Sequence, residues 1–197
     1  MNRNECLLDR AIIFAVRAHQ GAERKGKGFP YIVHCLEAVE IVATMTRDQE
    51  LLAAAVLHDV LEDTDTTADV LRHEFGERVA SLVEAESDVK VSCSRADSWH
   101  LRKQVAIERL AQASRDVKMV AMGDKLSNMR AIARDYATQG NDLWNIFNVK
   151  DPKEHEWHYR GLAEALRDLR DTFAYREFVQ LLGQVFGEGG KERKELI

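Results

Sequence analysis

The chain has 197 residues, of which 45% are hydrophobic and 31% charged, and its formal net charge at pH 7 is −5. A chain of this length and apolar content can bury a core as one domain, which excludes a disordered or fibrous protein. The acidic balance argues against general binding to nucleic acid or to an anionic membrane surface.

Apolar residues recur every three or four positions along most of the chain, which is the period of amphipathic helices. The first run ends before the loop GAERKGKGFP, whose three glycines and proline interrupt a helix. Asp48 and Thr66 or Thr67 are typical N-cap residues, and Phe75-Gly76 is a typical helix end. Helices are therefore expected at about 7–20, 31–46, 51–61, 67–75, 77–88, 97–113, 116–136, 142–147, 153–172 and 175–186.

These patterns predict an all-α fold, because no convincing alternation typical of strands is found. We expect one compact helical bundle of roughly ten helices over residues 1–187, followed by a charged, frayed tail over 188–197. Cys6, Cys35 and Cys93 show no paired spacing, and neither a signal peptide nor an apolar span of ~20 residues is present. The sequence therefore predicts a cytoplasmic protein without nucleic-acid or membrane partners, and leaves a homo-oligomer open.

The segment VLHDVLEDTDTT places four ionisable side chains within an otherwise apolar helix, namely His58, Asp59, Glu62 and Asp63. Burying such groups costs free energy unless a metal ion or water compensates for it. On one continuous helix, His58 and Glu62 share a face, and so do Asp59 and Asp63. A metal bound by this segment would need further ligands from elsewhere in the chain.

Two residues outside this segment are candidate ligands. His34 begins the second expected helix, and Asp124 lies between apolar positions of VAMGDKLSNMRAI. Two imidazoles and two carboxylates form a mixed set that suits Mn²⁺, Fe²⁺ or Zn²⁺. The alternatives are a capping His34, a solvated acidic helix end and an Asp124 that faces solvent, and spacing alone favours them. The remaining histidines are interpreted as ordinary residues: His19, His73, His100, His155 and His158.

Three longer segments, in the same order, resemble one known family. FAVRAHQGAERKGKGFPYIVH, AAVLHDVLEDTDTTADVLRHEFGERVASLVE and VKMVAMGDKLSNMRAI are similar to the hydrolase domain of the RelA/SpoT homologues. The chain looks most like the free-standing small alarmone hydrolases, which are HD-domain metal-dependent phosphohydrolases. The match covers about residues 11–130 and continues more loosely through HEWHYRGLAEAL. The resemblance implies a Mn²⁺-dependent guanosine-3′,5′-bis(diphosphate) 3′-pyrophosphohydrolase of the stringent response, which converts (p)ppGpp into GDP or GTP plus pyrophosphate.

The resemblance also implies roles for individual residues. Mn²⁺ would be bound by His34, His58, Asp59 and Asp124. Glu62 and Asp63 would activate and orient the attacking water. The implied nucleotide contacts are Arg24, Lys25, Lys90, Arg102 and Asn128. Lys125 is expected to form a salt bridge on its own helix instead.

Four positions depart from the usual pattern of this family. Cys35 replaces a proline after the first histidine ligand, and Gly123 and Ser127 alter a motif that usually reads ADRLHN or ADKLYN. Glu86 begins ESD where the family tends to read VTD, and it adds negative charge if it points inward. These changes leave open another nucleotide substrate, such as NADPH or a nucleoside monophosphate, or a catalytically silent nucleotide sensor. Four aromatic residues either line the pocket or pack the core: Trp144, Phe147, Trp157 and Tyr159.

Overall fold

The structure, a computed structural model, describes residues 6–87 and 98–187. Over these ranges the chain forms ten α-helices, two 3₁₀ helices and no strand beyond an isolated bridge between Glu23 and Pro30. The predicted all-α fold is therefore confirmed. The helices are α1 (Leu7–Ala18), α2 (Ile32–Ala43), α3 (Gln49–Leu57), α4 (Val60–Asp63), α5 (Ala68–Phe75), α6 (Glu77–Glu86), α7 (Ser98–Gln112), α8 (Arg115–Gln139), η1 (Gly140–Ile146), α9 (Pro152–Ala165), η2 (Arg167–Leu169) and α10 (Phe173–Phe186). Lys90 and the tail 188–197 lie outside the described residues.

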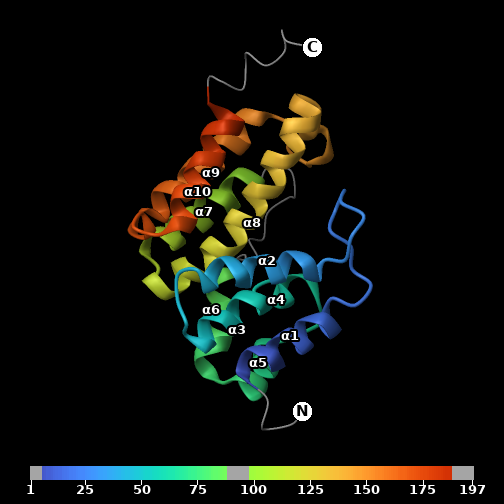
Figure 1. Ribbon diagram of the computed structural model, residues 1–197, viewed down its shortest axis with the longest axis vertical. Helices are drawn as coiled ribbons and strands as arrows, with labels where there is room; N and C mark the ends of the chain where they lie inside the picture. The colour runs from blue at the N-terminus through green and yellow to red at the C-terminus, as the bar shows by residue number, and fades with distance from the viewer. Residues whose placement is uncertain (1–5, 88–97, 188–197) are drawn as a thin grey trace.

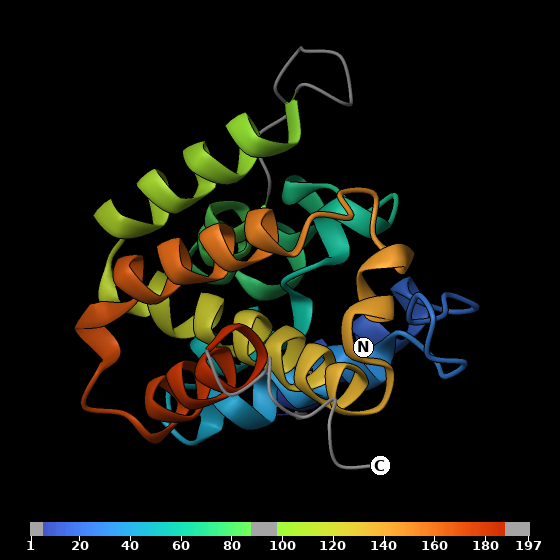
Figure 2. The ribbon, with the colours of Figure 1, turned by 90° about the horizontal axis from the view of Figure 1, so that it is seen from above.

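Two apolar clusters divide the helices into two halves. The first lies among α1, α3, α5 and α6, and the second lies among η1, α9 and α10, while α2 and α8 contribute to both. Figure 1 shows this division, with α1 and α5 at one end, α9 and α10 at the other, and α2 and α8 between them. Figure 2 shows α7 running alongside α9. None of the described helices is both long and apolar enough to cross a membrane.

Local sequence signals explain several helix ends. The Asp48 carboxylate accepts a hydrogen bond from the Glu50 N–H at 2.9 Å, as expected for an N-cap of α3. Thr67 caps α5 in the same way through the Val70 N–H. Gly76, with a φ of +90°, separates α5 from α6. These predicted boundaries are confirmed.

The continuous helix predicted over 51–61 is wrong, because the chain breaks at His58 and Asp59 between α3 and α4. The His58 Nδ1 atom lies 2.8 Å from the Ala55 carbonyl oxygen. In a continuous helix that carbonyl would accept the N–H of residue 59, so the imidazole replaces a backbone donor. Asp59 then starts a new turn, since its own carbonyl accepts from the Asp63 N–H at 3.0 Å.

Two other predicted helices also differ in detail. The segment expected as a helix at 142–147 is the 3₁₀ helix η1, and the segment expected over 153–172 ends as an α-helix at Ala165. Beyond it the Leu169 N–H bonds to the Leu166 carbonyl, three residues back, which is the tighter 3₁₀ pattern. Thr172 then caps α10 through the Tyr175 N–H at 3.2 Å.

Gly123 lies where α2 and α8 pack closely together. A Cβ atom at this position would lie 2.7 Å from the Ala38 carbonyl oxygen and 2.8 Å from Val42 Cγ2. No side chain fits there unless the helices move apart. The departure from the family motif at Gly123 therefore has a packing explanation, and the contact holds α8 against the helix that carries His34.

We expect Gly123→Ala to destabilise the protein by about 1–3 kcal/mol, because backbone atoms of α2 must move to admit the methyl group. The measurement is urea unfolding followed by circular dichroism. Gly183→Ala is the matched control on α10, where an added Cβ meets nothing within 4 Å. Alanine is the better helix former, so the control is expected to gain up to ~1 kcal/mol. A Gly123→Ala protein as stable as its parent would contradict the packing explanation.

Candidate active site

The four predicted metal ligands converge from three parts of the chain. His34 lies on α2, His58 and Asp59 lie at the junction of α3 and α4, and Asp124 lies on α8. The His34 Nε2 atom is 3.2 Å from His58 Nε2, 3.2 Å from Asp124 Oδ1 and 3.4 Å from Asp59 Oδ2. His58 Nε2 lies 2.7 Å from Asp59 Oδ2 and 3.7 Å from Asp124 Oδ1. The break after α3 therefore brings together residues that spacing on one helix would have separated.

The hydrogen bonds of the two imidazoles define which nitrogens face the centre of this cluster. His58 Nδ1 can only donate to the Ala55 carbonyl. His34 Nδ1 lies 2.8 Å from Ser127 Oγ, whose single proton is donated to the Glu37 carboxylate at 2.7 Å. Both Nδ1 atoms therefore carry protons, and in the neutral imidazoles both Nε2 atoms present lone pairs to the cluster.

Two lone pairs and two carboxylate oxygens within this space repel one another unless a cation lies among them. Three of the residues, His34, His58 and Asp59, offer ligand atoms within 4.8 Å of one another. All of these side chains are largely buried, with Asp124 8% and both histidines 3% exposed. A mixed imidazole and carboxylate set of this size fits a divalent ion such as Mn²⁺, Fe²⁺ or Zn²⁺.

The pKa shifts have the same electrostatic origin. Burial alone would lower the pKa of His58, but the negative charges of Asp59 and Asp124 outweigh burial and raise that pKa well above its usual value. Burial opposes ionisation of Asp59, yet the neighbouring positive charge of His58 and the contacts with both imidazoles hold the pKa of the Asp59 carboxyl below its usual range. Lys125 and the two histidines lower the pKa of Asp124 against the same burial effect. The cluster thus attracts positive charge.

Neutral and cationic donors surround the carboxylates. The Tyr31 hydroxyl donates to Asp59 Oδ2 at 2.7 Å, and Asn128 Nδ2 donates to Asp124 Oδ1 at 2.5 Å. Arg24 links the two, since its guanidinium donates to the Tyr31 hydroxyl at 3.4 Å and to Asn128 Oδ1. The predicted nucleotide residues Arg24 and Asn128 are therefore in contact with each other and, through their partners, with both carboxylates.

The loop that carries Arg24 has a defined shape. The Arg24 N–H bonds to the Phe29 carbonyl at 2.9 Å, and Gly26 and Gly28 have φ values of +72° and +69°. These φ values favour glycine, as the loop composition predicts. Lys25 is exposed at the tip of this loop and lines neither of the cavities described next.

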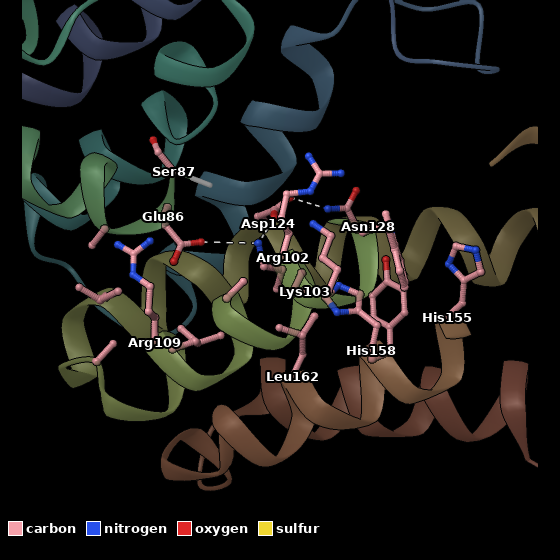
Figure 3. Close-up of a pocket in the computed structure, with 18 of the residues that line it drawn as sticks. Glu86, Ser87, Arg102, Lys103, Arg109, Asp124, Asn128, His155, His158 and Leu162 are labelled. Carbon is pink, nitrogen blue, oxygen red and sulfur yellow. Dashed lines mark hydrogen bonds and ion pairs between the residues drawn. The ribbon is translucent and has the colours of Figure 1, made fainter. Parts of the chain in front are cut away.

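Two adjoining cavities open from the cluster. The smaller, of about 140 Å³, is lined by His58, Asp59, Glu62, Arg24 and Tyr31 among others. The larger, of about 350 Å³, lies among α7, α8 and α9 (Figure 3). The residues that line both are Glu86, Lys103, Asp124, Lys125 and Asn128.

The larger cavity combines positive charge with aromatic surface. Its cationic lining residues are Arg102, Lys103, Arg109 and Lys125, and its ring-bearing ones are Trp99, Phe147, His155, His158 and Tyr159. Figure 3 shows Arg102 and Lys103 from α7 and His158 from α9 around this space. This combination suits a ligand with phosphate groups and a planar base.

Glu86 points inward and lines both cavities. Its side chain is 7% exposed, and its Oε2 lies 3.7 Å from Lys125 Nζ. Burial raises the pKa of Glu86, while the positive charge of Lys125 opposes that rise. Lys125 also lies 2.6 Å from Asp124 Oδ2, so the predicted salt bridge on its own helix is present. The ammonium group thus lies between two buried carboxylates.

The two predicted catalytic carboxylates differ in position. Glu62 is exposed and lines the small cavity beside His58 and Asp59. Asp63, the next residue of α4, is exposed and lies outside the lining of both cavities. Its charge nevertheless acts on Tyr31, whose pKa is raised first by burial, then by Asp59 and then by Asp63. Glu62 is therefore the carboxylate with the more direct access to the cluster.

Sequence reasoning missed several residues of this region. Tyr31 lies three residues before the ligand His34, and Lys103 directly follows Arg102; this closeness in sequence was the available signal. His155 and His158, interpreted as ordinary, line the larger cavity. The four aromatic residues that could line the pocket or pack the core differ in position. Phe147 and Tyr159 line the cavity, Trp144 is buried in the core, and Trp157 stacks on His100.

The chain is similar to several known proteins. A family model described as HD domain matches residues 11–151. The guanosine-3′,5′-bis(diphosphate) 3′-pyrophosphohydrolase MESH1 of Homo sapiens is 37% identical over 194 residues, which cover 96% of this chain and 98% of that protein. The GTP pyrophosphokinase rsh of Brucella ovis is 35% identical over 135 residues, and the chain spans 17% of its length. A solved structure described as a metazoan ortholog of SpoT that hydrolyzes ppGpp matches the fold with a TM-score of 0.75, at 23% identity over 95% of this chain and 99% of that one.

The raised pKa of His58 predicts how the metal-free protein responds to pH. Because the folded pKa lies above the unfolded value of ~6.5, the stabilisation from protonated His58 is complete below pH ~6.5 and is lost as pH rises through the folded pKa. We therefore expect the thermal midpoint of the metal-free protein to fall as the pH rises above ~6.5 and through the raised pKa of His58. His58→Gln is expected to flatten this fall, whereas His73→Gln, on an exposed side chain of α5, leaves it unchanged. Equal pH profiles for all three proteins would contradict the assignment.

Proposed function

Because this chain belongs to the HD-domain family, we propose that it is a Mn²⁺-dependent (p)ppGpp 3′-pyrophosphohydrolase. The observation that carries the proposal is the continuity between two sites. The His34, His58, Asp59 and Asp124 cluster borders a small cavity that adjoins a larger one with cationic and aromatic walls. A metal centre beside a nucleotide-sized cavity is what hydrolysis of a nucleotide polyphosphate requires.

Charge supports a substrate with several phosphates. The chain carries a net charge of −5, yet four cationic side chains line the larger cavity, against the carboxylates of Glu86 and Asp124. Arg24 adds a fifth cation at the small cavity. Guanidinium groups bind phosphate through two N–H donors or stack on a base, so Arg24 and Arg102 are proposed nucleotide contacts. Asn128 is a third, since it lines both cavities. Lys25 and Lys90 keep this proposed role on the family resemblance alone.

The chain's own residues account for the proton chemistry. His34, His58, Asp59 and Asp124 would hold the ion, which supplies a Lewis acid that polarises the phosphoryl group and lowers the pKa of water. Glu62, on the wall of the small cavity, would accept the proton of the attacking water. The water oxygen would then bond to the phosphorus on the ribose 3′ oxygen as the bond from that phosphorus to the 3′ oxygen breaks. Pyrophosphate would leave, and the 3′ oxygen would become a hydroxyl by taking up the proton that Glu62 accepted. Asp63 would orient the water from the outer side.

The neighbouring residues would keep this machinery in place. Tyr31 fixes one carboxylate ligand through its hydroxyl, and Asn128 fixes the other through its amide. Arg24 bonds to both of these side chains, so substrate bound to Arg24 would also be aligned with the cluster. The guanidinium therefore couples nucleotide binding to the position of the metal ligands.

The proposal has three further parts: Mn²⁺ is the native ion, residues 1–187 form a single domain, and the protein is cytoplasmic. Mn²⁺ is supported by the mixed imidazole and carboxylate donors, which also suit Fe²⁺ and Zn²⁺. The single domain is supported by the way α2 and α8 contribute to both apolar clusters. The cytoplasmic location is supported by the cysteine spacing described above.

We expect metal-stripped protein to release pyrophosphate from ppGpp only after Mn²⁺ is added. Asp59→Ala and Asp124→Ala are expected to lose this activity, since each removes one candidate ligand. Exposed Asp69→Ala on α5 is the control. NADPH and deoxynucleoside monophosphates are assayed in parallel with phosphate release as the readout. If only these nucleotides are hydrolysed, they replace ppGpp as the proposed substrate. If folded, Mn²⁺-loaded protein binds ppGpp without hydrolysing it, the protein is a nucleotide sensor.

Glu62→Gln is expected to lower kcat by about 10²–10⁴-fold while KM changes little, because a lost general base affects the chemical step. The measurement is steady-state pyrophosphate release at saturating Mn²⁺. Asp63→Asn is expected to have the smaller effect, since Asp63 lies outside the cavity walls. If Asp63→Asn is the more damaging change, the assignment of the base passes from Glu62 to Asp63.

A further inference from the structure

A chain of hydrogen bonds runs from the metal cluster to Glu37, a residue that the function described so far does not use. Ser127, on α8, lies between His34 and Glu37, both on α2. We propose that Ser127 and Glu37 are positioning residues that hold His34 with its Nε2 lone pair directed at the metal ion. This inference rests on the proposed metal site, although not on the identity of the nucleotide.

The direction of the hydrogen bonds follows from what each group can donate. Glu37 is a carboxylate and accepts only, so Ser127 donates its one proton to Glu37 Oε2 at 2.7 Å. The serine oxygen must then accept from His34 Nδ1 at 2.8 Å. A protonated Nδ1 leaves Nε2 as the ligand atom in neutral His34. Removal of Glu37 would free the serine proton to point at Nδ1, which favours the tautomer that cannot bind metal through Nε2.

Burial raises the free-energy cost of losing either hydrogen bond. Ser127 is 2% exposed and His34 is 3% exposed, so water is a poor substitute for either partner. The serine side chain is short enough to lie within hydrogen-bond distance of both groups at once. Ser127 is also one of the four departures from the family motif, which usually carries a ring at this position. The departure thus has a role beside the metal centre.

Glu37 is itself held by a surface ion-pair network. Arg130 Nη1 donates to Glu37 Oε1 at 3.3 Å, while Arg130 forms two hydrogen bonds of 2.7 and 2.8 Å with Glu177 on α10. Glu40 lies farther from the same guanidinium, at 3.6 Å. Arg130 therefore leaves one oxygen of Glu37 for Ser127. Glu37 and Glu40 share a helix, a charge and an arginine partner, but only Glu37 bonds to Ser127.

This pair of glutamates gives a matched experiment. Mn²⁺ affinity is measured without nucleotide, from the electron paramagnetic resonance signal of the free ion during titration of metal-stripped protein. We expect Glu37→Ala to weaken Mn²⁺ binding by about 10- to 100-fold, the usual effect of removing a partner behind a ligand. Glu40→Ala removes the same charge from the same helix and is expected to change the affinity by less than about threefold, since an exposed charge is screened.

Ser127→Ala is the second variant and is expected to weaken Mn²⁺ binding by a similar factor of about 10 to 100. Ser81→Ala is its control, because Ser81 donates to Glu77 at 3.1 Å on the exposed face of α6. In both weakened variants, saturating Mn²⁺ is expected to restore kcat with an unchanged KM for the nucleotide. Circular dichroism checks that each protein is folded.

Equal losses in Glu37→Ala and Glu40→Ala would assign the effect to charge and overturn the proposal. Unchanged Mn²⁺ affinity in folded Ser127→Ala would overturn it as well, and so would a kcat that saturating Mn²⁺ does not restore. Failure of the proposed substrate gives a different result, because the Mn²⁺ titration contains no nucleotide. A parent protein that binds no Mn²⁺ would instead refute the metal site itself.

Discussion

The structure depends on one electrostatic constraint, which is that two imidazole nitrogens and two carboxylate oxygens face one another in a nearly buried space. Such a cluster is unfavourable without positive charge, because low dielectric strengthens the repulsion. The raised pKa of His58 and the lowered pKa values of Asp59 and Asp124 express the same demand for a cation. A proton on His58 compensates part of the negative charge of the cluster, and a divalent ion compensates more of it.

The packing between the two halves positions the residues of this cluster. α2 and α8 belong to both apolar clusters, and each carries one ligand, His34 or Asp124. The close approach at Gly123 brings those two helices together one residue before Asp124. Polar contacts then lead outward from the ligands, to Tyr31 and Arg24 on one side and to Ser127 and Glu37 on the other. The core positions the helices, and the hydrogen bonds orient the ligands.

Helical periodicity and cap residues were enough to predict most of the fold, because they are local properties of the chain. The break at His58 and Asp59 could not be predicted in this way, since it depends on an imidazole that replaces a backbone N–H at the Ala55 carbonyl. The convergence of His34 with Asp124 was likewise a long-range property, and only the family resemblance indicated it. Spacing favoured the ordinary alternatives, whereas burial and distance bring these side chains together.

Glu86 is the departure from the family pattern that most directly affects the charge of the cavity. A lone carboxylate in a polyphosphate cavity would repel the ligand, yet Glu86 lies beside Lys125, which also contacts Asp124. The effect of Glu86 on the cavity is therefore to offset a cation rather than to leave a negative charge unpaired. Arg102, Lys103 and Arg109 still line the same space. The positive charge of the cavity therefore lies mainly on α7, because Lys125 on α8 faces the two carboxylates of Asp124 and Glu86.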